Sequence, residues 1–100
     1  MKVGLILECG PVGADAKVIP HLIDLINKEY GKNVIYAPPV TLGDNSQLMI
    51  DCGGAAKRLL ETDNCDCVVI IWDLDTKKKW RKGRCLGKDR KDIFASLNTA

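Results

Sequence analysis

Three short apolar runs along the chain predict the strands of a β-sheet. The first covers residues 2–7, and the second is the segment NVIYA at 33–37. The third, CDCVVIIW at 65–72, is apolar at nearly every position rather than at alternate positions. Continuous runs of this kind are typical of strands buried on both faces of a parallel sheet. We therefore expect the third run to be the central strand.

The segment between the first two runs carries apolar residues at helical spacing. Asp15 is suited to be the N-cap of this helix, Gly31 is suited to end it, and Pro20 predicts a local kink inside it. The apolar positions recur three and four residues apart, at Val18, Ile19, Leu22, Ile23 and Ile26. The pattern therefore predicts an amphipathic helix after the first strand.

Two more helices are predicted downstream. Residues 46–61 favour a helix that Gly53 and Gly54 can divide in two, and residues 87–98 favour the last helix. The segment PPVTLGDN at 38–45 is rich in turn-forming residues, so we expect a loop there.

The resulting order, β-α-β-α-β-α, predicts a three-layer α/β fold with a mostly parallel central sheet. Residues 1–100 suffice for a single domain of this kind. Three strands would leave one apolar sheet edge open, which soluble proteins avoid. We therefore expect either a homodimer or a longer natural chain that supplies a further strand.

The composition agrees with a globular protein, since 46% of the residues are hydrophobic and 28% are charged. The apolar run at the N-terminus is too short for a signal peptide, which predicts a cytoplasmic protein. Five cysteines, an odd number, indicate reduced thiols. Cys65 and Cys67 form a C-x-C pair, but a zinc site usually has a wider spacing and needs two more ligands. The single histidine is His21, within the first predicted helix.

Three acidic residues follow predicted strands: Glu8 after the first, and Asp73 and Asp75 after the third. Ligands of parallel α/β sheets gather at the carboxyl ends of the strands. Clustered carboxylates repel one another unless a cation neutralises them, and Mg²⁺ or Mn²⁺ prefers such oxygen ligands. The alternative is that the two aspartates cap a turn and Glu8 is solvated.

The segments LILECGPVGADAKVIPHL and VVIIWDLD resemble two motifs of the Toprim domain, as found in the overcoming-lysogenization-defect nucleases and related small Toprim-like proteins. The likeness covers most of the chain in order and spacing. It departs at Cys9, which stands between the glutamate and Gly10, where the family commonly has Gly directly after the acid.

The resemblance implies roles for the acidic residues. Glu8 would be a general acid/base or a metal ligand, and Asp73 and Asp75 would hold Mg²⁺ or Mn²⁺. Asp15 would either join this cluster or serve only as the helix N-cap. The resemblance further implies phosphodiester cleavage, strand transfer or nucleotide polymerisation. Of these we expect cleavage of DNA or RNA by a nuclease, and the family association suggests a role in defence against phage.

The charge distribution points to the same class of partner. Residues 1–76 contain six Lys/Arg and eleven Asp/Glu, whereas residues 77–100 contain nine and two. We expect a basic loop at 77–91 to bind phosphates, with Trp80 stacking on a base or sugar. The predicted contacts are Lys77, Lys78, Lys79, Trp80, Arg81, Lys82 and Arg84. The alternative is a solvated loop with Trp80 tucked under the domain.

Two other functions remain open at this point. A haloacid-dehalogenase-type phosphatase also has a DxD motif after a strand, but normally after the first strand. That family has Thr or Val two residues after the second acid, where this chain has Lys77. A Toprim-like module that binds nucleic acid or protein without cleavage is the alternative that is not an enzyme.

Overall fold

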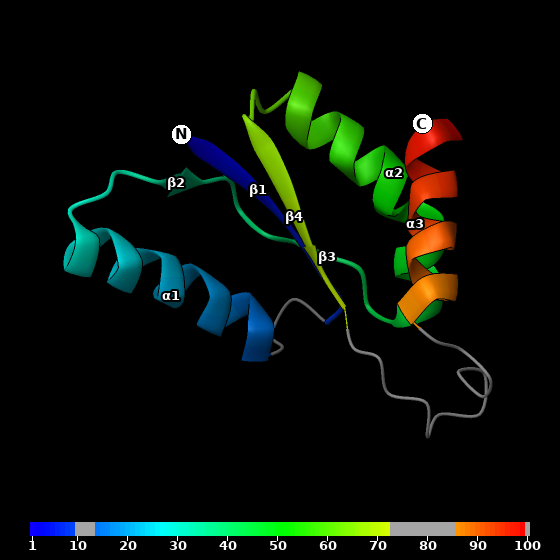
Figure 1. Ribbon diagram of the computed structural model, residues 1–100, viewed down its shortest axis with the longest axis horizontal. Helices are drawn as coiled ribbons and strands as arrows, with labels where there is room; N and C mark the ends of the chain where they lie inside the picture. The colour runs from blue at the N-terminus through cyan, green and yellow to red at the C-terminus, as the bar shows by residue number, and fades with distance from the viewer. Residues whose placement is uncertain (10–13, 73–85, 100) are drawn as a thin grey trace.

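The computed structural model describes residues 1–9, 14–72 and 86–99, and forms an α/β fold (Figure 1). The strands and helices follow in the order β1 (Lys2–Leu7), α1 (Ala14–Tyr30), β2 (Ile35–Tyr36), β3 (Val40–Thr41), α2 (Asn45–Glu61), β4 (Cys67–Ile71) and α3 (Leu86–Thr99). The alternation predicted from the sequence is therefore confirmed, with one additional short strand. None of the described helices has the length and apolar character needed to cross a membrane.

The sheet is parallel and is built around β1. β4 pairs with β1 from Val3 to Leu7, and β2 and β3 pair with the first and last parts of β1. Since a strand has only two edges, β2 and β3 share the edge opposite β4. The prediction that the third apolar run is the central strand is therefore wrong for the described sheet. β1 is central, and it is also the more deeply buried strand.

The segment predicted as a loop at 38–45 contains β3, so that prediction was wrong at Val40 and Thr41. Val3 pairs with Tyr36 and Ile6 with Val40, so this edge holds one more residue than β1 over the same distance. The extra residue falls in the segment between β2 and β3, which contains Pro38 and Pro39, residues that have no N–H for the sheet. An edge position tolerates such prolines.

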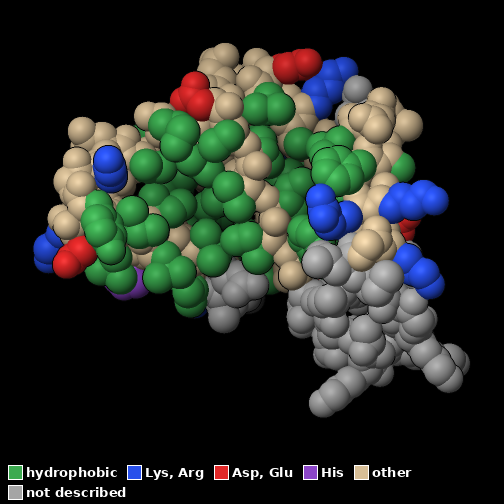
Figure 2. All heavy atoms as spheres, in the orientation of Figure 1, with side chains coloured by type: hydrophobic (Ala, Val, Ile, Leu, Met, Phe, Trp, Pro, Cys, Tyr) green, Lys and Arg blue, Asp and Glu red, His purple; other side chains and the backbone are tan. Residues whose placement is uncertain are grey.

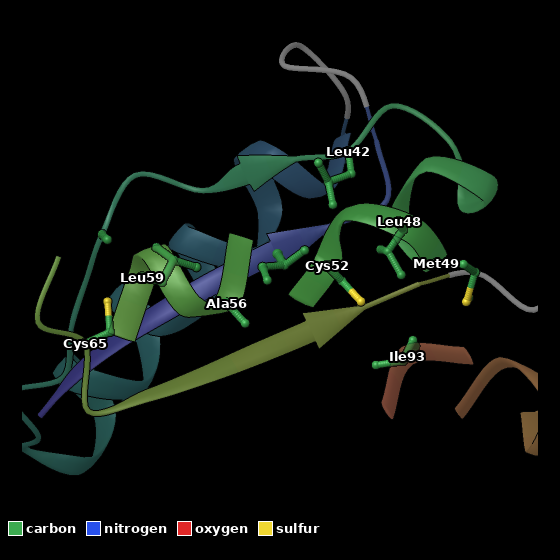
Figure 3. Packing of buried hydrophobic residues seen from close by; sticks show 10 residues of the cluster. Leu42, Leu48, Met49, Cys52, Ala56, Leu59, Cys65 and Ile93 are labelled. Carbon is green, nitrogen blue, oxygen red and sulfur yellow. The ribbon is translucent and has the colours of Figure 1, made fainter. Parts of the chain in front are cut away.

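Helices cover the two faces of the sheet separately. On one face, α1 contributes Ala16, Ile19 and Ile23, which pack against the buried side chains Val3, Leu5 and Leu7 of β1. On the other face, α2 and α3 enclose a larger cluster, seen from close by in Figure 3. Its buried members are Ile6, Ala37, Leu42, Leu48, Met49, Cys52, Ala56, Leu59, Cys65 and Ile93. The protein therefore has the predicted three layers.

α2 is continuous through Gly53 and Gly54, so the predicted division of this helix is wrong. Gly53 allows close approach to α3, because a Cβ atom there would overlap the carbonyl group of Ser96. The Gly53 N–H donates to Ser96 Oγ at 2.9 Å, and this hydroxyl donates to the Ile50 carbonyl at 2.9 Å. Gly53 thus allows α2 and α3 to pack closely, and it does not break α2.

Candidate active site at the carboxyl end of the sheet

Glu8 directly follows β1 and lies beside the end of β4. Its backbone N–H donates to the carbonyl oxygen of Ile71, the last residue of β4, at 3.1 Å. The Glu8 side chain is half-buried, and its Oε1 atom is shielded from solvent. The carboxyl ends of the two strands are therefore level, and the chain that leaves β4 starts next to Glu8.

Asp73 and Asp75 lie outside the described residues. The description of this segment ends at Trp72, one residue before Asp73. The expected convergence of Glu8, Asp73 and Asp75 therefore stays a prediction, although the backbone of Glu8 is already next to the strand that leads to the two aspartates.

Asp15 lies inside α1, so its predicted position as the N-cap is wrong. The helix begins at Ala14, which makes Asp15 its second residue. The position of its side chain is outside the description, so its membership of the acidic cluster stays a prediction.

A further acidic residue at this end of the sheet, Asp89, was missed from the sequence. It lies in the first turn of α3 and is fully buried. Its Oδ2 atom accepts a hydrogen bond of 3.0 Å from Nε1 of Trp72, which follows β4 directly. This bond ties the start of α3 to the end of the strand that leads to Asp73.

A signal for Asp89 does exist in the sequence. Asp89, Ile93 and Leu97 are spaced four residues apart, and Ile93 and Leu97 pack in the larger cluster enclosed by α2 and α3. Residues at this spacing share one face of a helix, so Asp89 falls on the inward face of α3. The charged neighbours of Asp89 in the sequence conceal this signal.

The predicted basic loop is only partly described. Residues 77–85, which include Trp80, lie outside the description, and residues 86–91 belong to α3. The prediction of a loop is therefore wrong for residues 86–91, which form the start of a helix whose inward face packs in the cluster under α2. Lys88, Arg90 and Lys91 are exposed on this helix, with the Arg90 guanidinium 5.9 Å from the centre of the Phe94 ring.

The cysteines of the described part do not form a metal site. Cys65 packs in the cluster under α2, whereas Cys67 packs in the cluster under α1, on the opposite face of the sheet. Cys9, Cys52, Cys65 and Cys67 are free thiols. No group of three or more His, Cys, Asp or Glu residues suited to a metal ion occurs within the described residues.

A shallow hollow of about 380 Å³ lies between α2 and α3, away from Glu8. Gly53, Ala56 and Leu60 line it from α2, and Leu97 lines it from α3. Its walls present one lysine, Lys57, and one acid, Glu61. None of the described residues that line this hollow is one of the site residues predicted from the sequence.

Comparison of the chain with protein-family models, curated proteins and solved structures finds no match. The assignment of a function consequently rests on the residues and their arrangement.

Proposed function

We propose that this chain is a Toprim-like domain that cleaves phosphodiester bonds of DNA or RNA with the help of Mg²⁺ or Mn²⁺. Glu8, Asp73 and Asp75 would form its active site. The basic residues that follow Asp75 would bind the phosphates on either side of the cleaved bond.

The hydrogen bond between Glu8 N and Ile71 O is the main support for this proposal. It brings the acid that follows β1 next to the strand after which Asp73 and Asp75 come in the sequence. Two acidic segments 65 residues apart in the chain thus start from the same end of one parallel sheet. Ligands of such sheets bind at this end.

The types of residue suit the proposed chemistry. All three side chains offer carboxylate oxygens, the ligands that a hard divalent cation prefers. Asp73 and Asp75 would hold the ion, which would stabilise negative charge on the phosphate. Glu8 is half-buried, and its carboxylate would move a proton to or from the reacting oxygen or would add a ligand.

Cleavage assays test the proposal directly. The protein is incubated with single- and double-stranded DNA and RNA in the presence of Mg²⁺, Mn²⁺ or EDTA. We expect cleavage with either metal, no cleavage with EDTA, and loss of cleavage in Glu8→Gln, Asp73→Asn and Asp75→Asn. Asp51→Asn, at an exposed acid on α2, is the matched control and should retain activity. Cleavage that persists in Asp73→Asn would refute the assigned site.

A module that binds nucleic acid without cleaving it is the second candidate. Lys88, Arg90 and Lys91 favour it, because they expose positive charge on α3 whether or not the acids are catalytic. A titration with Mn²⁺ separates the two candidates. The nuclease should bind the ion and lose it in Asp73→Asn, whereas a pure binding module should be indifferent to Mn²⁺.

The phosphatase alternative has less support. Its DxD motif normally follows the first strand, whereas here the motif follows β4, the last strand described. The strand at the equivalent position, β1, is followed by Glu8 instead.

A further inference from the structure

The outer edge of β4 lies in an exposed apolar surface. Among the described residues, β4 pairs only with β1, so its other edge presents N–H and C=O groups with no described strand beside them. β4 lies nearer to the viewer than β1 in Figure 1, and Figure 2 shows hydrophobic side chains gathered over it, between α1 and α2. Monomeric proteins rarely expose both an apolar patch and a free strand edge.

Val69 marks the centre of this surface. Side chains alternate between the faces of a strand, so Val69 points to the same face as Cys67 and Ile71. Those two pack in the cluster under α1, whereas Val69 lies beyond it and is 41% exposed. α1 therefore covers β1 and the ends of β4 on this face, but it leaves the middle of β4 exposed to solvent.

A stripe on α1 borders the open area. Its members are Val18, Leu22, Leu25 and Ile26, each between 45% and 48% exposed. Asp24, on a different side of the helix, accepts a hydrogen bond from Tyr36 of β2. With 100° between successive residues, Leu22 and Ile26 lie roughly on the side of the helix opposite Asp24. Because β2 and β4 occupy opposite edges of the sheet, this stripe is turned toward β4.

We propose that a second copy of this chain covers this surface, with the two β4 strands paired antiparallel about a two-fold axis at Val69. Two-fold symmetry requires that each residue of β4 meet a residue of the same strand. With the axis at Val69, Cys67 meets Ile71, Val68 meets Ile70, and Val69 meets its own copy. Cys67–Ile71 contains no charged residue and no proline, so this self-pairing places no like charges together and loses no N–H.

The same symmetry brings the two α1 helices together. An axis perpendicular to the sheet keeps both copies of α1 on the same face, with their apolar stripes turned toward each other above the paired Val69 side chains. Three strand spacings separate the helix axes, roughly 14 Å. A helix with its side chains is about 10–12 Å across, so the large side chains of the two stripes come close to contact. The dimer therefore covers the strand edge and brings the two stripes close together.

Molecular mass from light scattering during gel filtration, across a concentration series, tests the dimer. We expect the wild type to be a dimer and Val69→Lys and Leu22→Lys to be monomers with unchanged circular dichroism. Ile50→Lys is the matched control, because Ile50 is 75% exposed on α2, on the opposite face of the sheet, and this variant should remain a dimer. A monomeric wild type would overturn the proposal, as would a dimer that both lysine variants retain.

A cross-linking experiment checks the register. In an antiparallel pair, directly opposed Cβ atoms are about 4.5–5.5 Å apart, which is close to the spacing that a disulfide needs. Val69→Cys should therefore give a disulfide-linked dimer on mild oxidation, in excess of any background from the native cysteines. Ile50→Cys should give none above the wild type. Equal cross-linking of the two variants would contradict pairing about Val69.

Discussion

At the scale of single residues, the carboxylate of Asp89 is buried and has lost its hydrogen bonds to water, so it depends on hydrogen bonds within the protein. Its Oδ2 atom accepts the hydrogen bond from Trp72 Nε1, and loss of a partner from a buried polar group costs about 1–3 kcal/mol. We expect Asp89→Ala to lower the free energy of unfolding by about that amount or more. Asp89→Asn keeps an acceptor oxygen and should cost less. Urea denaturation followed by circular dichroism measures both, with Asp51→Ala as an exposed control. Equal losses in the two Asp89 variants would exclude the Trp72 bond as the cause.

Tyr36 gives a prediction that depends on pH. Removal from water raises the pKa of the Tyr36 phenol, and the negative charge of Asp24 and the 3.4 Å hydrogen bond to it raise this pKa further. The folded protein therefore resists ionisation of Tyr36. The stabilising effect is complete below the usual tyrosine pKa of about 10, and it is lost as the pH rises through the higher pKa of the folded state.

Ultraviolet titration of tyrosinate in a Tyr30→Phe background would measure the pKa of Tyr36 alone, since the chain has two tyrosines. We expect it above the usual value. Asp24→Asn removes the charge but not the burial, which is the larger cause, so the pKa should fall without reaching the usual value. A pKa unchanged by Asp24→Asn would contradict the assigned contact.

At the scale of the elements, two neighbouring glycines of α2 should respond in opposite directions to alanine. Gly53→Ala would force a methyl group into the backbone of Ser96, and overpacking of this kind costs about 1–3 kcal/mol. At Gly54 an added Cβ meets nothing within 4 Å, and the higher helix propensity of alanine should stabilise by about 0.5–1 kcal/mol. Thermal unfolding of the two variants provides the comparison. Destabilisation of similar size in both would contradict the contact between α2 and α3.

The local pattern of the chain was sufficient to predict the helices and the two long strands. Apolar spacing identifies α1, α2 and α3, and continuous apolar runs identify β1 and β4. It could not identify β3, because Pro38 and Pro39 predict a loop in the absence of a neighbouring strand. The order of the strands could not be predicted from the local pattern either. Both long strands are mostly apolar, and only pairing with β2 and β3 makes β1 central.

The same limit applies to the candidate site. Glu8 could be predicted to lie at the end of a strand because it directly follows an apolar run. The position of Asp89 was missed, because Lys88, Arg90 and Lys91 beside it in the sequence conceal its spacing with the apolar residues and make it look like one more surface charge. Its burial is decided by the docking of α3 onto the end of β4, which is a tertiary contact.

At the scale of the whole molecule, positive charge is concentrated in the last quarter of the chain, and the rest is acidic. A polyanion would therefore meet attraction at one segment and repulsion over most of the remaining surface. If the basic segment binds nucleic acid, its loss should affect both affinity and the response of affinity to salt, because each neutralised phosphate releases counterions.

Two charge-neutralised variants, a test variant and a matched control, show whether the basic segment binds nucleic acid. One replaces five basic residues of the segment by glutamine, at Lys77, Lys78, Lys79, Arg81 and Lys82. The other replaces five exposed basic residues of the acidic part, at Lys17, Lys28, Lys32, Lys57 and Arg58. Both lose the same charge, so a general effect of net charge would weaken binding equally. We expect only the first to flatten the slope of log affinity against log salt, by about 0.7–0.9 for each phosphate contact removed. An unchanged slope in the first variant would exclude a role for the segment in nucleic-acid binding.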